Sequence, residues 1–199
     1  SQQQRELVSL LKGNKADFGS YQQLSDLYIR DNTSTKPVLQ NVTSTHTGNQ
    51  SNDNNPWNLF DNDTGTKFYA GDPSAVPKPA NVPVTIEWNY NMPVTFTSYS
   101  FTSANDDYGR DPYKWKLYGS NNGTDYTLID SQDEFEFTVE TPLTPIEVGI
   151  TGKKHNNRHV RKETKTFEAS GTYQYFRLII EETFSTSNNA PQLSEVTLN

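Results

Sequence analysis

The sequence Trp57-Asn58-Leu59-Phe60-Asp61-Asn62-Asp63-Thr64-Gly65-Thr66-Lys67-Phe68-Tyr69 contains a short polar loop with apolar, strand-like flanks. Asp61 and Asp63 supply carboxylates and Thr66 a hydroxyl, while Asn62 and Gly65 tolerate the positive φ angles that a tight turn requires. Such oxygen donors suit Ca²⁺ and suit Zn²⁺ poorly. The same composition is also that of an ordinary loop, and the loop is not an EF-hand because it lacks the Glu at position 12.

The amino-acid composition of the whole chain favours an all-β fold. A chain of 199 residues can hold one domain of ordinary size with a short appendage. Only 32% of the residues are hydrophobic but 12% are aromatic, which is typical of a core of large aromatic side chains on short strands. There are no cysteines, so disulfides, thiolate metal sites and cysteine catalysis are excluded.

The charge of the chain bears on its partners. A net charge of −7 disfavours binding to nucleic acid or to anionic membranes, and no apolar run approaches the length of a membrane span. One basic segment, residues 153–165, interrupts this acidic chain. We expect it to be a solvated hairpin or loop; the alternative is a contact for an anionic glycan or an acidic protein.

The periodicity predicts two short helices in residues 1–30 and strands in the rest of the chain. Val84, Ile86 and Trp88 alternate with polar residues, and Asn122-Gly123 is a strong hairpin signal. The predicted strands are 37–43, 84–88, 95–103, 113–118, 126–130, 133–139, 175–181 and 193–198. We therefore expect a jelly-roll β-sandwich over residues 36–199, with residues 1–35 as a helical appendage or linker.

The order of several segments along the chain resembles that of the discoidin family, also called coagulation factor 5/8 type C, and of the related galactose-binding-like carbohydrate-binding modules. The resemblance spans residues 57–199 and departs from the family at Phe68, where a Trp is usual, and in a longer 140–163 connection. The matching segments are 58–68, 103–106, 110–123, 164–167, 175–178 and 193–196.

The resemblance implies a structural Ca²⁺ that ties the N- and C-terminal strands together. The ligands it implies are the carbonyls of Asn58 and Ser194, the carbonyl or hydroxyl of Thr66, and the carboxylates of Asp61, Asp63 and Glu195. All of these positions hold oxygen donors of the kind that calcium prefers.

The resemblance also implies a ligand site in loops at one end of the sandwich. An aromatic ring there would stack on a sugar, and Arg, Asn and Asp would bind its hydroxyls. The candidate residues are Tyr69, Asp72, Asn105, Asp106, Tyr108, Arg110 and Asn188. The alternative for Arg110 is a structural ion pair with Asp111.

We expect a non-catalytic module, because no acid/base pair, phosphate loop or serine elbow is recognisable. The predicted function is binding of a glycan, at the surface of or outside the cell, as a module attached to other domains of a longer protein. Recognition of a protein in adhesion or assembly is the alternative.

Overall fold

The computed structural model describes residues 36–46, 48, 53–71, 82–137, 163–186 and 190–199. The predicted helices of 1–30 and residues 153–162 of the basic segment lie outside these ranges. Residues Pro37–Asn199 form one compact unit. Among the described residues, no helix is both long and apolar enough to cross a membrane.

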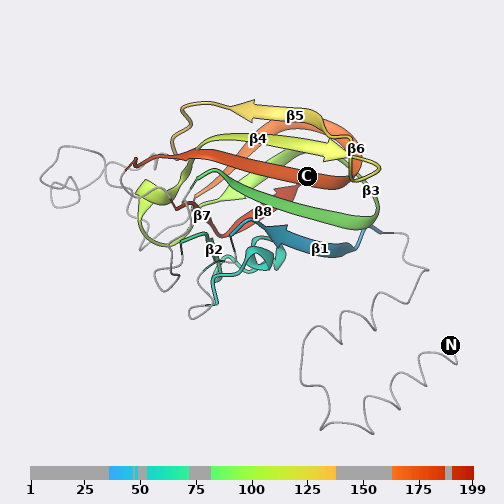
Figure 1. Ribbon diagram of the computed structural model, residues 1–199. Helices are drawn as coiled ribbons and strands as arrows, with labels where there is room; N and C mark the ends of the chain where they lie inside the picture. Colours follow the sequence, from blue (N-terminus) through green and yellow to red (C-terminus); the bar gives the residue numbers. More distant parts are fainter. Residues whose placement is uncertain (1–35, 47, 49–52, 72–81, 138–162, 187–189) are drawn as a thin grey trace, which may run out of the picture. The chain divides into compact units, whose positions relative to one another are not determined.

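The described fold is an antiparallel β-sandwich, which confirms the all-β prediction (Figure 1). Two 3₁₀ helices, η2 (Pro56–Phe60) and η3 (Tyr108–Arg110), lie between strands. The strands are β1 (Leu39–Ser44), β2 (Phe68–Tyr69), β3 (Val84–Thr102), β4 (Pro112–Ser120), β5 (Thr127–Gln132), β6 (Thr164–Thr183), β7 (Gln192–Leu193) and β8 (Glu195–Leu198).

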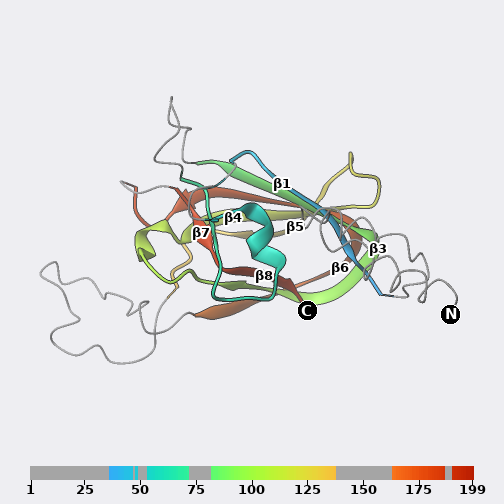
Figure 2. The same cartoon turned by 90° about the horizontal axis from the view of Figure 1, so that it is seen from below.

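Two long strands, β3 and β6, belong to both layers. They pair along most of their length but bend, with register shifts between Asn89 and Val94 and between Phe96 and Ser98 (Figures 1 and 2). The first half of β3 lies beside β1 in a sheet of order β1-β3-β6-β4-β5. The second half pairs with β8, which brings the C-terminus into the other layer.

The core between the layers is aromatic, as the composition predicted. The Trp115 ring centroid lies 5.1 Å from that of Phe101 and 5.2 Å from that of Phe167. The indole N–H of Trp115 donates to the Tyr99 hydroxyl at 2.9 Å, which in turn donates to Asp130 at 2.6 Å. The predicted alternation of Val84, Ile86 and Trp88 is confirmed, since all three are buried.

The predicted turn at Asn122-Gly123 is confirmed. The prediction of a strand at 133–139 is wrong over the part that the structure describes. Gly123 has a φ of +74°, and the Asn122 side chain accepts bonds from two backbone N–H groups that follow it. Residues 133–137 form no strand, because Glu134 has a φ of +54°, which breaks an extended backbone. Phe137 nevertheless packs into the core.

The short ribbon of β2 and β7 positions the loops at one end of the sandwich. Phe68 pairs with Leu193 and Tyr69 with Gln192, so the segment that follows the polar loop lies beside the segment that leads into β8. In Figure 1, η3 lies at the same end as this ribbon. Among the described residues, those predicted to bind the cation and those predicted to bind the ligand therefore lie at the same end of the sandwich.

Candidate functional site

The polar loop that follows η2 is shaped by its own side chains. The Asp61 carboxylate accepts from the backbone N–H of Asp63 at 2.8 Å and lies 2.7 Å from the Thr66 hydroxyl. Asp63 accepts from the N–H of Gly65 at 2.7 Å, and Asn62 has a φ of +60°. These contacts hold two exposed carboxylates in one compact turn, as the sequence predicted.

Glu195, on the last strand, reaches this turn from the protein interior. Glu195 is only 6% exposed, and its Oε1 atom is buried without a hydrogen-bond partner among the described residues. Burial, a hydrogen bond with the Asp61 carboxylate and the negative charges of Asp61 and Asp63 raise the pKa of Glu195 to about 8. A buried carboxyl held beside two other carboxylates is an environment that a cation would relieve.

The other predicted cation ligands, Asn58 and Ser194, are buried beside this cluster. The Asn58 amide donates to the backbone carbonyls of Asp53 and Lys67, which fixes the end of η2 against the loop. Ser194 is fully buried, and its N–H donates to the Thr102 carbonyl at 2.8 Å. Both residues are therefore held rigidly where their strands and the loop meet.

The donor set fits Ca²⁺ only if backbone oxygens take part. Within the described part of the chain, no three His, Cys, Asp or Glu side chains already lie in a metal-binding arrangement. A cation would have to draw Asp61, Asp63 and Glu195 together against their mutual repulsion. Backbone carbonyls of the predicted ligands would complete an all-oxygen sphere of the kind that calcium accepts.

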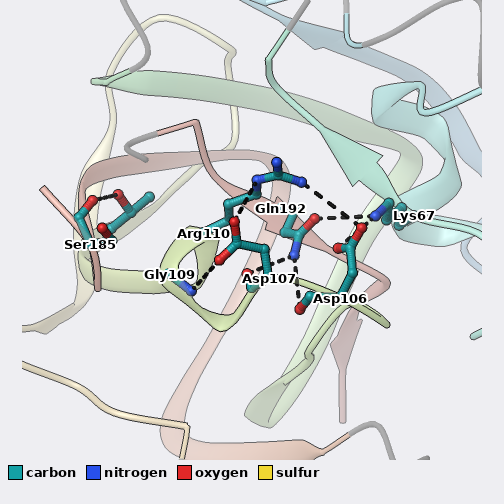
Figure 3. A network of polar contacts seen from close by, with 8 residues as sticks. Lys67, Asp106, Asp107, Gly109, Arg110, Ser185 and Gln192 are labelled. Carbon is teal, nitrogen blue, oxygen red and sulfur yellow. Dashed lines mark hydrogen bonds and ion pairs between the residues drawn. The ribbon is translucent and has the colours of Figure 1, made fainter. Parts of the chain in front are cut away.

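The second cluster forms where the loop before η3 approaches β2 and β7 (Figure 3). The Arg110 guanidinium lies over the Tyr69 ring, 4.4 Å from its centroid. Arg110 also forms ion pairs with Asp106 at 3.9 Å and with Asp107 at 3.5 Å. Arg110 is thus held by three neighbours, and one face of the Tyr69 ring is covered.

Asp106 is anchored from the other side by a lysine. The Lys67 ammonium lies 2.8 Å from the Asp106 carboxylate and donates to the Gln192 side chain at 3.2 Å. Partial burial raises the pKa of the Asp106 carboxyl, but the hydrogen bond and charge of Lys67, together with Gln192 and Arg110, lower it below its ordinary value. Asp106 is therefore a fixed, charged acceptor of the kind that binds hydroxyl groups.

The remaining predicted ligand residues divide between this cluster and elsewhere. Tyr108 begins η3, and its ring centroid lies 5.6 Å from that of Phe184. Asn105 is exposed at the bend before Asp106. Asp72 and Asn188 lie outside the described residues. The structure therefore unites Tyr69, Asp106 and Arg110, with Asn105 and Tyr108 flanking them.

Sequence reasoning missed Lys67, Asp107 and Gln192 as parts of this cluster. Asp107 caps η3, since its carboxylate accepts from the N–H of Gly109 at 3.0 Å. A buried Gln has no sequence signature, because only the pairing of β2 with β7 brings it under the loop. The one sequence signal that could have indicated Lys67 was its position directly after the predicted cation loop.

No protein-family model and no curated protein matches the sequence. Several solved structures share the fold. A module named CpGH89CBM32-5 from Clostridium perfringens, in complex with GalNAc-β-1,3-galactose, has a TM-score of 0.56 and 12% identity over 78% of this chain and 91% of its own.

The fold is that of the CBM32 modules. CBM32-3 from a family 31 glycoside hydrolase of C. perfringens has a TM-score of 0.57 and 15% identity, over 79% of this chain and 88% of its own. The family 32 module of C. perfringens NanJ, in complex with galactose, has a TM-score of 0.52 and 12% identity, over 79% of this chain and 91% of its own. The CBM32 fold confirms the galactose-binding-like resemblance at the level of architecture.

The Lys67–Asp106 pair predicts a change in titration. In Lys67→Met the burial of Asp106 remains and the largest compensating interaction is lost, while Gln192 and Arg110 stay in place, so we expect the pKa of Asp106 to rise. A lowered pKa adds stability that is present above the unfolded value of about 4 and is lost as the pH falls. The variant should lose this contribution to stability.

Carbon-detected NMR titration of the Asp106 carboxyl measures this change. Lys114→Met is the matched control, because Lys114 pairs instead with Asp133 at 3.0 Å. An unchanged Asp106 pKa in Lys67→Met would contradict the assigned role of Lys67.

Proposed function

We propose that this chain is a non-catalytic carbohydrate-binding module whose sugar site is the cluster of Tyr69, Asp106 and Arg110. The observation that carries the proposal is this convergence of an aromatic ring, a charged acceptor and a guanidinium at the loop end of a CBM32 fold. Aromatic rings stack on sugar rings, and paired Arg and Asp groups bind neighbouring hydroxyls. Two solved structures with this fold are named as complexes with galactose or GalNAc-β-1,3-galactose.

The charges of the cluster favour a neutral sugar. Lys67 and Arg110 bring two positive charges, and Asp106 and Asp107 bring two negative charges, within one set of ion pairs. A balanced set of this kind offers donors and acceptors without a net field that would attract a carboxylate. Galactose therefore fits the cluster better than a uronic acid does.

The carboxyl groups of the site support binding rather than catalysis. A general acid needs a pKa near the working pH, whereas Lys67 lowers the pKa of Asp106. Glu195 does have a raised pKa, but it is only 6% exposed and faces Asp61. A substrate bound at Tyr69 and Arg110 would thus meet a carboxylate that stays charged.

We propose that Ca²⁺ binds the cluster of Asp61, Asp63 and Glu195 and joins the loop to the last strand. Its support is the buried, unpaired Oε1 of Glu195 beside two carboxylates. Extracellular modules bind calcium at about 0.1–1 mM, so calcium outside the cell would fill a site of ordinary strength. We accordingly propose that the module works outside the cell or on its surface.

The sugar site predicts the effect of removing Arg110. We expect Arg110→Ala to weaken binding of galactose or GalNAc-β-1,3-galactose by about 10- to 100-fold, the loss typical of hydrogen bonds to a charged group. Isothermal titration in calcium-containing buffer measures the affinity.

Arg177→Ala is the matched control for this variant. Arg177 also lies over a tyrosine ring, 3.9 Å from the Tyr126 centroid, and pairs with Glu87 at 2.6 Å, but on the sheet. Equal losses in both variants would refute the assigned site. Failure of the wild type to bind any glycan on an array would favour protein recognition instead.

The cation site predicts the effect of neutralising Glu195. Calcium at about 100 times its Kd adds about 2.7 kcal/mol, which corresponds to a rise in melting temperature of about 5–10 °C for a domain of this size. We expect Glu195→Gln to lose this rise. In chelator it should melt close to the wild type near neutral pH, because glutamine preserves size and is uncharged, like the carboxyl of Glu195 below its raised pKa of about 8.

Differential scanning calorimetry with calcium and with chelator measures both effects. Glu181→Gln is the control, since Glu181 pairs with Lys116 at 2.7 Å, away from the loop. A calcium-induced rise in Glu195→Gln equal to that of the wild type, or no rise in the wild type, would overturn the cation assignment.

A further inference from the structure

Gln192 is a buried polar residue between the two clusters. It is only 1% exposed and forms half of the two-residue strand β7, where it pairs with Tyr69. Its side-chain amide donates to the carbonyl of Asp107 at 3.0 Å and lies 3.4 Å from that of Asp106 (Figure 3). Its side-chain oxygen accepts from Lys67 at 3.2 Å. One side chain thus satisfies both the loop backbone and the lysine.

These contacts fix the position of the Asp106 carboxylate from two directions. The amide of Gln192 holds the backbone at 106–107, and the same side chain orients the Lys67 ammonium that binds the carboxylate. A buried amide that lost one of these partners would leave polar groups unsatisfied, which is costly. The loop position therefore depends on where β7 places Gln192.

The ribbon of β2 and β7 adjoins the cation cluster along the chain. Gln192 lies three residues before Glu195, and Lys67 directly follows Thr66 of the polar loop. The Lys67 carbonyl accepts from the Asn58 side chain at 3.0 Å. Because β2 and β7 have only two residues each, their own ladder is short, and the contacts at their ends add to the burial of Phe68 and Leu193 in holding them.

We propose that Gln192 is a positioning residue through which the cation cluster sets glycan affinity. A cation that draws Glu195 toward Asp61 and Asp63 holds β7 in place, and Gln192 then holds the 106–110 loop in its binding arrangement. Linkage is reciprocal, so a bound glycan raises the affinity for the cation by the same factor. This inference rests on the proposed function, because it concerns the same sugar site.

The first experiment measures glycan affinity with and without calcium. Galactose and GalNAc-β-1,3-galactose are titrated into the wild type and Gln192→Leu, each with calcium and with chelator. We expect the wild type to bind the glycan about tenfold more weakly in chelator. This change in affinity corresponds to the loss of about one hydrogen bond. Gln192→Leu should bind about tenfold more weakly in both buffers and keep its calcium-induced rise in melting temperature.

Two further variants separate positioning from general damage. Gln192→Glu keeps an acceptor for Lys67 but removes the donor to the Asp106 and Asp107 carbonyls, so it should behave like Gln192→Leu. Gln132→Leu is the matched control, because Gln132 bonds to Asp130 on β5 at 2.9 Å. It should keep the affinity of the wild type in both buffers.

A second readout needs no glycan. In ¹⁵N-resolved NMR spectra, calcium should shift the amide signals of residues 106–110 in the wild type and leave them nearly unchanged in Gln192→Leu, while residues 61–66 shift in both proteins. Equal shifts of 106–110 in both proteins would overturn the role of Gln192.

The titrations distinguish the possible failures. Wild-type affinity that is the same with and without calcium overturns the coupling and leaves the sugar site intact. A calcium effect of equal size in Gln192→Leu overturns the role of Gln192. Absence of glycan binding in every protein refutes the proposed function and, with it, the coupling to glycan affinity.

Discussion

The constraint on which the functional end of this molecule depends is the buried carboxyl of Glu195 beside Asp61 and Asp63. Burial and like charge raise its pKa to about 8, and its Oε1 has no hydrogen-bond partner among the described residues. Groups of this kind are expensive unless a cation compensates them. The proposed Ca²⁺ would displace the proton of Glu195 and make the three neighbouring carboxylates into the contact that joins β8 to the polar loop.

That contact matters because the polar loop and the C-terminal strands β7 and β8 meet there. β8 pairs with the second half of β3. β7 ends two residues before β8 begins, and it pairs with β2 beside the polar loop. Gln192 and Lys67 then connect this junction to the loop that carries Asp106 and Arg110. The proposed calcium site and the proposed sugar site thus share one short ribbon, which is the physical basis for the coupling that we propose.

The sequence predicted the layers better than the details of the site. Alternation at Val84–Trp88 and the Asn122 turn depend on local side-chain chemistry, so both were recognisable. Glu134 has a positive φ that no local signal indicates, and the predicted strand at 133–139 was wrong over 133–137. Gln192 was missed because its partners are more than eighty residues distant in sequence. Contacts between distant loops arise from strand pairing, which periodicity alone does not reveal.

The most direct test of the account is a crystal structure of the chain grown with calcium and galactose. We predict galactose in contact with Tyr69, Asp106 and Arg110. We also predict a calcium ion about 2.3–2.6 Å from carboxylate oxygens of Asp61, Asp63 and Glu195. Galactose bound on another surface, or a loop at 61–66 that holds no cation at millimolar calcium, would contradict it.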